Sequence, residues 1–263
     1  MASEFIPDPH RAAFAPRALP KPANEPAAAG QVALDADHLH SNGIFGFDEL
    51  DIRGRSFTFL RSLLHNDFYR PGGRVLAICS ARPGDGKTFV ATNLAAAISR
   101  IQPACLVDLD LRKPMLAERF GLVPQAGVDD LLEQAQSFDD VAVTVAGEAL
   151  TLFPIRQARR NSTELLSGPM LAQMFAALRD QPDHPFILVD TPPALVLDDM
   201  LLIAEHVDGV IFVVEEGKSR SDELKEAIRL LHGTPLIGTV LNRSLSSSGD
   251  RYSYAGYYET RDR

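Results

Sequence analysis

The sequence lacks the features of several large protein classes. It has no run of 18 or more apolar residues, so it encodes no transmembrane helix, and its first residues lack the apolar core of a signal peptide. Its two cysteines, Cys79 and Cys105, lie in apolar runs and are expected to be buried thiols rather than a disulfide or a metal pair. These absences predict a cytoplasmic protein.

Positive charge is also scarce. The 263-residue chain has 26 Lys and Arg against 35 Asp and Glu, which gives a net charge of −9. The composition therefore argues against non-specific binding of nucleic acid through a basic face. Apolar residues make up 45% of the chain, as in ordinary globular proteins, and the length allows one large domain with an arm or tail.

Aromatic residues are few and unevenly placed. The chain has no tryptophan and five tyrosines, of which only Tyr69 lies outside the last twelve residues. A packed core would spread such residues through the fold. The stretch YSYAGYYETRDR follows a segment rich in Ser and Gly, which is expected to be flexible. Its tyrosines indicate hydroxyl groups on a movable tail, or alternatively a tail that stacks its rings in a groove: Tyr252, Tyr254, Tyr257 and Tyr258.

Proline marks the beginning of the chain as an arm. Six prolines fall within the first 26 residues, and the remainder of the arm has no sustained apolar period. Such a composition buries too little apolar surface to offset the entropy of ordering. We predict a disordered arm at residues 1–42, a folded domain at 43–243 and a flexible tail at 244–263.

Within the domain, short apolar runs alternate with helical segments. The runs are apolar throughout, which is typical of parallel strands covered on both faces. Strand–helix repetition of this kind predicts an α/β doubly wound fold with a mainly parallel sheet. Strands are expected at residues 74–80, 104–110, 150–155, 185–191, 209–216 and 235–242, and helices at 87–100, 170–180 and 221–233.

A helical pattern also precedes the first of these strands. Phe57, Leu60, Leu63 and Leu64 recur at i, i+3, i+6 and i+7, and they are expected to form one apolar stripe. The stripe can pack on the domain itself or dock a partner subunit, and the sequence leaves both interpretations open.

The stretch SARPGDGKT joins the first strand to the long helix, where a doubly wound fold binds phosphate. Gly84 and Gly86 allow backbone N–H groups to turn towards an anion. Lys87 supplies a positive charge for the phosphates, and Thr88 supplies a hydroxyl ligand for Mg²⁺. Ala81 replaces the first glycine of the usual G-x-x-x-x-G-K-[ST] pattern, but strand, GKT and helix keep their order.

Carboxylates follow the phosphate loop at two places. Asp108 and Asp110, in LVDLDLR, lie at the end of one strand, and Asp190, in ILVDTPP, ends another at the Walker B position. Side chains two apart in a strand point to the same side, so Asp108 and Asp110 can face one metal ion. Each acid alone is equally consistent with a helix cap or a turn. Together, in a chain with a phosphate loop, they predict a Mg²⁺ site.

These motifs resemble those of a known family. The cytoplasmic domain of bacterial tyrosine kinases, the autokinases of capsule and exopolysaccharide synthesis, has similar stretches in the same order: SARPGDGKT, LVDLDLRKP, RRNSTELLSGP, FILVDTPPALVLDD and GTVLNR. The resemblance covers roughly residues 45–263, and its discriminating parts are D-x-D-x-R and the tyrosine-rich tail. It implies a P-loop NTPase of the deviant Walker type, related to the MinD and ParA ATPases.

The resemblance also implies roles for residues at matching positions. Asp190 would hold Mg²⁺ through water, Asn242 would lie beside the adenine, and Asp108 would help to activate the acceptor hydroxyl. The predicted catalytic residues are Lys87, Asp108 and Asp110. The predicted metal ligands are Thr88, Asp108 and Asp190. The predicted nucleotide-binding residues are Pro83, Gly84, Asp85, Gly86, Lys87, Thr88, Phe89 and Asn242, and the predicted autophosphorylation sites are Tyr252, Tyr254, Tyr257 and Tyr258.

Cofactors and partners follow from the same resemblance. The cofactors are ATP and Mg²⁺, and the reaction is phosphorylation of the tail tyrosines in a neighbouring subunit of a homo-oligomer. A membrane activator of the polysaccharide co-polymerase type is expected as a separate chain, which would hold this protein peripherally at the inner membrane. A cognate phosphotyrosine phosphatase would reverse the reaction, and no nucleic-acid partner is expected.

The sequence departs from the family at three places. Where many members carry an E-x-x-R-x-x-R motif for ring assembly, Arg55, Thr58 and Arg61 match it only at the last position. Arg82 stands where MinD-like ATPases have a signature lysine. It is either a solvated loop residue or an arginine that acts on a partner subunit's nucleotide. Finally, RRNSTELL replaces a proline-rich stretch.

A second function is compatible with the phosphate loop. A MinD-like or ParA-like ATPase hydrolyses ATP to change its oligomeric or membrane-bound state. Against this interpretation, Arg82 replaces the signature lysine, and no terminal amphipathic membrane helix is evident. A third interpretation is a nucleotide-binding scaffold for polysaccharide synthesis without catalysis.

Overall fold

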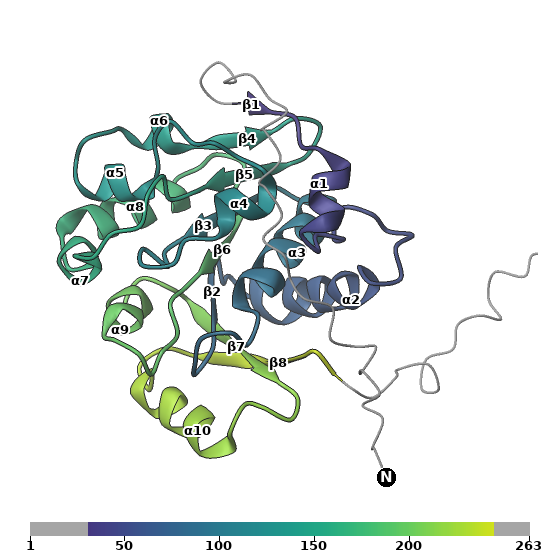
Figure 1. The fold of residues 1–263 in the computed structure, drawn as a ribbon, viewed down its shortest axis with the longest axis vertical. Helices are drawn as coiled ribbons and strands as arrows, with labels where there is room; N and C mark the ends of the chain where they lie inside the picture. Colours follow the sequence, from purple (N-terminus) through teal and green to yellow (C-terminus); the bar gives the residue numbers. More distant parts are fainter. Residues whose placement is uncertain (1–30, 245–263) are drawn as a thin grey trace, which may run out of the picture.

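The computed structural model describes residues 31–244, which fold around an eight-stranded sheet. Its strands lie in the order β1-β4-β5-β3-β6-β2-β7-β8, and all neighbours are parallel except β4 and β5 (Figure 1). The strands are β1 (Gln31–Val32), β2 (Val75–Cys79), β3 (Ala104–Asp108), β4 (Val143–Val145), β5 (Leu150–Phe153), β6 (Phe186–Asp190), β7 (Gly209–Glu215) and β8 (Leu236–Asn242).

Helices cover both faces of this sheet (Figure 1). In the described part of the chain, none of them combines the length and the apolar character needed to cross a membrane. They are α1 (Ala36–Ser41), α2 (Arg55–Leu64), the π-helix η1 (His65–Tyr69), α3 (Lys87–Ser99), α4 (Leu116–Phe120), α5 (Val128–Leu132), α6 (Phe138–Val141), α7 (Ser162–Leu166), α8 (Pro169–Arg179), α9 (Asp199–Ala204) and α10 (Ser221–Leu230).

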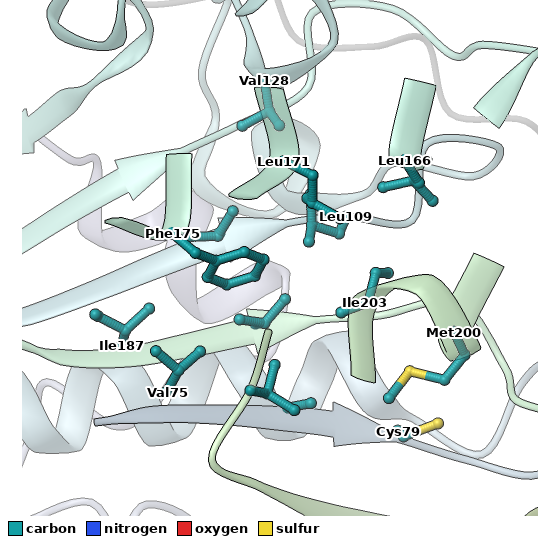
Figure 2. Packing of buried hydrophobic residues seen from close by; sticks show 14 of the residues in the cluster. Val75, Cys79, Leu109, Val128, Leu166, Leu171, Phe175, Ile187, Met200 and Ile203 are labelled. Carbon is teal, nitrogen blue, oxygen red and sulfur yellow. The ribbon is translucent and has the colours of Figure 1, made fainter. Parts of the chain in front are cut away.

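The central strands β2, β3 and β6 are buried along their whole length. Val75 and Cys79 of β2 point into one apolar core (Figure 2). Residues of α5, α7, α8, α9 and α10 belong to the same core. Leu76 and Ile78 point into a second core on the other face, which packs against α2, η1, α3 and α4. Burial on both faces explains the uninterrupted apolar runs and confirms the predicted parallel doubly wound fold. Both cysteines are buried free thiols, as predicted.

Helix α2 packs on the domain, but its predicted stripe is wrong at one position. Phe57 and Leu64 are buried in the second core, whereas 44% of Leu63 is exposed. At about 100° per residue, position 63 lies roughly 120° from position 57 around the helix, so it leaves the core face. The apolar face continues instead to Phe68 of η1, which is buried.

Residues 31–42 are ordered, in contrast to the prediction of a disordered arm at 1–42. Strand β1 pairs with β4, and the side chain of Asp35 caps α1 by accepting a 2.7 Å hydrogen bond from the His38 N–H. Arg119 of α4 donates a 2.6 Å hydrogen bond to the C-cap carbonyl of α1. The folded domain therefore includes residues 31–42, which the prediction placed in the arm. The rest of the predicted arm, and nearly all of the predicted tail, lie outside the described residues.

The segment after α1 is held tightly against α3, the helix that carries the phosphate loop. Asn93 of α3 accepts hydrogen bonds from the N–H groups of Phe45 (2.7 Å) and Gly46 (3.1 Å). Its amide group donates to the carbonyl oxygens of Gly43 and Phe89. A Cβ at Gly46 would lie 2.1 Å from the Asn93 carbonyl oxygen, so the two backbones touch directly. The N-terminal segment thus supports the helix on which the site is built.

Deletion of residues 1–42 is expected to lower the free energy of unfolding by about 2–3 kcal/mol, because Leu34 and Leu39 lose apolar contacts with the second core. Urea denaturation measures this effect. Deletion of residues 1–30 alone is the matched control and should leave the midpoint close to that of the full chain. Equal stability of the two deletion variants would contradict a structural role for β1 and α1.

Candidate active site

The phosphate loop lies between β2 and α3, where the sequence predicts it. Gly84 and Gly86 have φ values of +95° and +98°, a backbone conformation that side chains disfavour. At Gly86, an added Cβ would also lie 2.0 Å from Asn242 Nδ2. The turn into α3 therefore requires glycine both for its backbone conformation and for the close approach of Asn242.

The last strand is fastened to the phosphate loop by two side chains. Asn242 ends β8, and its Nδ2 donates a 2.8 Å hydrogen bond to the Asp85 carbonyl oxygen. Arg243 Nη1 donates to the Gly84 carbonyl oxygen (3.2 Å) and to Glu215 Oε2 (2.8 Å). The structure thus brings Asn242 to the loop from the far end of the sequence.

Asp190, at the end of β6, faces the first turn of α3. Thr88 Oγ1 donates a 2.6 Å hydrogen bond to Asp190 Oδ2, whereas Oδ1 is buried without a hydrogen-bond partner among residues 31–244. A buried carboxylate oxygen without a partner is costly unless a cation or water compensates its charge. Oxygen donors of this kind fit Mg²⁺, and Thr88 and Asp190 are the residues that would hold it.

The neighbouring Asp108 has a different environment. Its Oδ1 accepts a hydrogen bond from the Asp110 N–H (3.1 Å), and its Oδ2 accepts from the N–H groups of Met115 (3.2 Å) and Leu116 (3.1 Å). Burial and the nearby charge of Asp190 raise the pKa of Asp108 well above its ordinary range. The side chain is fully buried and closes the turn that follows β3.

Asp110 lies beyond the end of β3, so it does not share a strand face with Asp108 as predicted. It lines the cavity beside the phosphate loop; burial raises its pKa, while the charge of Lys87 opposes the shift. Within residues 31–244, no group of three or more Asp, Glu, His or Cys side chains is placed to hold one metal ion. The three predicted acids therefore do not converge on one ion in this structure.

A cavity of about 330 Å³ opens beside the loop. On one side, the loop and the first turn of α3 contribute Pro83, Gly84, Gly86, Lys87, Thr88 and Phe89. An apolar wall after β6 consists of Pro192, Pro193, Val196 and Leu197. Further cationic side chains come from Arg112, Lys113, Arg119 and Arg243. A cavity with a phosphate loop and this many cations suits a polyphosphate anion.

Six of the eight predicted nucleotide-binding residues line this cavity directly. Asp85 is buried and contributes its carbonyl group to Asn242 instead, and burial raises the pKa of its carboxyl group. Sequence reasoning missed Arg119, Arg243 and Asp199, which also line the cavity. Arg243 directly follows Asn242, which was predicted. Arg119 and Asp199 lie in the short helices α4 and α9, which contain too few residues to give a periodic signal. The four predicted acceptor tyrosines lie outside the described residues.

Arg82 and Arg61, which the comparison with the family pattern singled out, both have partners within this chain. Arg82 forms a 2.8 Å ion pair with Glu223 of α10, and 65% of its side chain is exposed, as for a solvated surface residue. Arg61, the matching position of the ring motif, donates a 3.1 Å hydrogen bond to the Ala97 carbonyl near the end of α3. Burial lowers the pKa of Arg61. Its guanidinium therefore serves the fold of its own chain.

Known proteins with similar sequences are kinases and polysaccharide-transport proteins, although no protein-family model matches the chain. Tyrosine-protein kinase YwqD of Bacillus subtilis is 31% identical over 192 residues, which cover 70% of this chain and 77% of that protein. The succinoglycan biosynthesis transport protein ExoP of Rhizobium meliloti is 31% identical over 189 residues, 68% of this chain and 23% of ExoP. The chain spans about a quarter of the length of several such relatives, including 27% of EpsB of Ralstonia nicotianae.

Solved structures give the same picture. The kinase domain of VpsO is 31% identical, with a TM-score of 0.67, over 73% of this chain and 97% of that domain. The kinase domain of the Escherichia coli tyrosine kinase ETK is 25% identical, with a TM-score of 0.72, over 80% of this chain and 84% of that domain. The cell division ATPase MinD of Pyrococcus furiosus is 26% identical, with a TM-score of 0.58, over 67% of this chain and 74% of MinD.

Asp190→Asn is expected to stabilise the nucleotide-free protein by about 1–3 kcal/mol at pH 7. The reason is that burial raises the pKa of Asp190 from 3.8 to about 6, so its ionised form is unfavourable in the folded state. This cost is fully present above the folded-state pKa, decreases as the pH falls below it, and is lost near the ordinary value of 3.8. The wild type should therefore gain stability relative to the variant between pH 7 and pH 5, as measured by urea unfolding without nucleotide or Mg²⁺.

Asp108→Asn is the matched comparison for this prediction. Both oxygens of Asp108 accept hydrogen bonds from backbone N–H groups. An asparagine side chain has only one oxygen, so in either orientation its NH₂ group would face a backbone N–H group. Asparagine removes an unfavourable buried charge at both positions, but only Asp108→Asn adds this mismatch, so it should be the less stable variant by about 1–3 kcal/mol. Equal stability of the two variants would contradict the different environments assigned to the two acids.

Proposed function

The chain belongs to the family of bacterial tyrosine-protein kinases, and we propose that it is an ATP-dependent autokinase that phosphorylates tyrosines of its own C-terminal cluster. The observation that carries the proposal is the pairing of Thr88 in the phosphate loop with the buried Asp190, beside a cavity rich in cations. ATPases and kinases share this fold, so the fold alone does not decide the activity. The residues that bind the phosphates and the metal ion do.

We assign the nucleotide phosphates to the loop and to Lys87, whose side chain is buried in the cavity wall. Thr88 and Asp190 would hold Mg²⁺, which would supply positive charge to offset the negative charge of the phosphates. Asn242 and Arg243 donate hydrogen bonds to carbonyl oxygens of the phosphate loop. These contacts support a position for the adenine at the side of the loop where β8 ends. The polyphosphate would then extend towards Lys87.

Transfer breaks the bond between the γ-phosphorus and the oxygen that links it to the β-phosphate. A bond forms from the tyrosyl oxygen to that phosphorus, ADP leaves, and the phenolic proton is released. Of the three predicted acids, Asp110 lines the cavity, whereas both oxygens of Asp108 accept backbone hydrogen bonds. We therefore assign the hydrogen bond to the acceptor hydroxyl to Asp110, in place of the role that the resemblance implies for Asp108.

We propose that the acceptor tyrosines come from a neighbouring subunit of a homo-oligomer. Asn242 ends β8 beside the phosphate loop, so the chain that follows starts at its own site. Ten residues span at most about 35 Å, which lets Tyr252 reach either its own site or a neighbour's. A return to its own site requires the chain to reverse direction within these ten residues, whereas a neighbour's site can accept it extended.

The relatives extend the proposal to a cellular role. ExoP is named a succinoglycan biosynthesis transport protein. By analogy, we propose that the kinase regulates the synthesis and export of an exopolysaccharide or capsule. A membrane activator on a separate chain would bind it at the inner membrane, and a phosphotyrosine phosphatase would remove the phosphate.

A second candidate function is an ATPase switch without tyrosine kinase activity, because the cell division ATPase MinD shares the fold. Both functions use Lys87 and Mg–ATP, so nucleotide binding alone does not separate them. The identity of the phosphate acceptor does: the kinase transfers phosphate to tyrosine, whereas the switch transfers it to water.

Lys87→Met is expected to reduce the transfer of labelled phosphate from ATP to tyrosine by at least about 100-fold, because a buried cation at the phosphates is lost. Label on tyrosine is measured after acid hydrolysis, and circular dichroism checks the fold. Lys225→Met, at an exposed position of α10, is the matched control and should transfer normally. Normal labelling of Lys87→Met would refute the assignment of the phosphate loop.

Transfer between subunits is expected when an inactive acceptor is mixed with an active donor. The acceptor is Lys87→Met, and the donor is a chain in which all four tail tyrosines are replaced by phenylalanine. Label should appear on the Lys87→Met chain, since its tyrosines can enter the donor's site. Its absence, with normal labelling of the wild type alone, would mean that each chain modifies itself.

A further inference from the structure

Three stretches that are far apart in the sequence meet at the edge of the cavity. Arg112 comes from the end of LVDLDLR, and Asp199 follows the end of DTPPALVLD at the start of α9; both line the cavity. Ser162 and Thr163 come from RRNSTELL, at the start of α7, and contact Asp199. The stretch that departs from the family pattern is therefore part of the wall of this site.

Asp199 is the centre of this cluster. It is 2% exposed, and its Oδ2 accepts hydrogen bonds from Ser162 Oγ (2.7 Å) and Arg112 Nε (3.1 Å). Its Oδ1 accepts a hydrogen bond from Thr163 Oγ1 (2.8 Å). Two hydroxyl groups and one guanidinium thus compensate the buried charge. A carboxylate fixed in this way holds its arginine in a defined orientation, since charge-assisted bonds are directional.

Arg112 is held at two of its three nitrogen atoms. Besides the bond from Nε to Asp199, its Nη1 donates to the Arg160 carbonyl oxygen at 3.4 Å. Its Nη2 has no hydrogen-bond partner in the part of the chain that the structure describes, and 35% of the side chain is exposed. The guanidinium is therefore held in place at the cavity wall and leaves its Nη2 group without a partner among the described residues.

The cavity relates Arg112 to the phosphate loop. Lys87, Asp110 and Asp199 all line the one cavity of about 330 Å³ beside the phosphate loop. Arg112 is bonded to Asp199 and lines the same cavity as Lys87. A phosphate chain that enters this cavity along Lys87 therefore shares it with the Arg112 guanidinium.

We propose that Arg112 binds the terminal phosphoryl group of the nucleoside triphosphate, and that Asp199 is the positioning residue that orients its guanidinium for this contact. The inference rests on the proposed nucleotide-binding function. The planar donors of arginine match phosphate oxygens, and a cation there stabilises charge during transfer. Ser162 and Thr163 act through Asp199, which gives RRNSTELL a role in the site.

The test measures the binding of adenylyl imidodiphosphate and of ADP, each with Mg²⁺, to the full chain by calorimetry. Asp199→Asn removes the charge that holds Arg112, and Arg112→Lys keeps the charge but removes the planar donors. Each substitution should lower the preference for the triphosphate analogue over ADP by about 10-fold, with ADP affinity nearly unchanged. The double variant should lose no more than either single variant, because both act through one contact.

Asp208→Asn is the matched control. Asp208 also pairs with an arginine, Arg179 (2.7 Å), and accepts backbone hydrogen bonds at the opposite end of β2. This variant should melt at a lower temperature but keep the wild-type preference for the triphosphate analogue. A loss of preference in this control as large as in Asp199→Asn would overturn the inference, because any lost ion pair would then suffice.

If Arg112→Lys keeps the wild-type preference for the triphosphate analogue, the inference is wrong, whatever the result with Asp199→Asn. Arg112 is partly exposed, so this variant provides the test even if Asp199→Asn does not fold. Phosphotyrosine and inorganic phosphate serve as further probes. If Arg112→Lys weakens their binding but leaves the triphosphate preference intact, Arg112 serves the product and the inference is wrong. A wild-type chain that binds neither nucleotide would overturn the proposed function as well, which distinguishes the two failures.

Discussion

The 2.6 Å hydrogen bond from Thr88 to Asp190 joins the first turn of α3 to the end of β6, and the candidate site is arranged around it. It exists because β2 and β6 are parallel neighbours whose register pairs Ile78 with Asp190. Both strands consequently end at the same edge of the sheet, and the loop after β2 must start beside the carboxylate. Parallel pairing of β3 with β6 places Asp108 beside Asp190 at the same edge.

This arrangement has a cost for the protein without nucleotide. Burial raises the pKa of Asp190 to about 6, and its Oδ1 has no partner within residues 31–244. Asp108 is equally buried; its pKa is raised by burial and by the charge of Asp190, and its oxygens accept hydrogen bonds from backbone N–H groups. Such unfavourable burial is typical of sites that bind a cation, since the ion relieves the cost that the fold imposes. The surrounding core, buried on both sheet faces, maintains the arrangement.

Local sequence patterns were sufficient to predict the central strands of the sheet and the positions of Lys87, Thr88 and Asp190. Each of these residues follows from a short apolar run and its junction with the next element. The function of Asp108 was not readable, because it depends on where the backbone of Met115 and Leu116 turns back towards the strand. Similarly, the role of Asp199 depends on its tertiary contacts with Arg112 and α7. The spacing of residues in the sequence does not predict these contacts. The order of residues 31–42 was missed because β1 is two residues long and α1 six.

The most direct measurement is mass spectrometry of the wild-type chain after incubation with Mg–ATP, followed by peptide mapping. The account predicts phosphate on one or more of the tail tyrosines, Tyr252, Tyr254, Tyr257 and Tyr258, with ADP formed in matching amount and no modification when ATP is omitted. Formation of ADP and inorganic phosphate without any modified tyrosine would contradict the account and favour an ATPase switch.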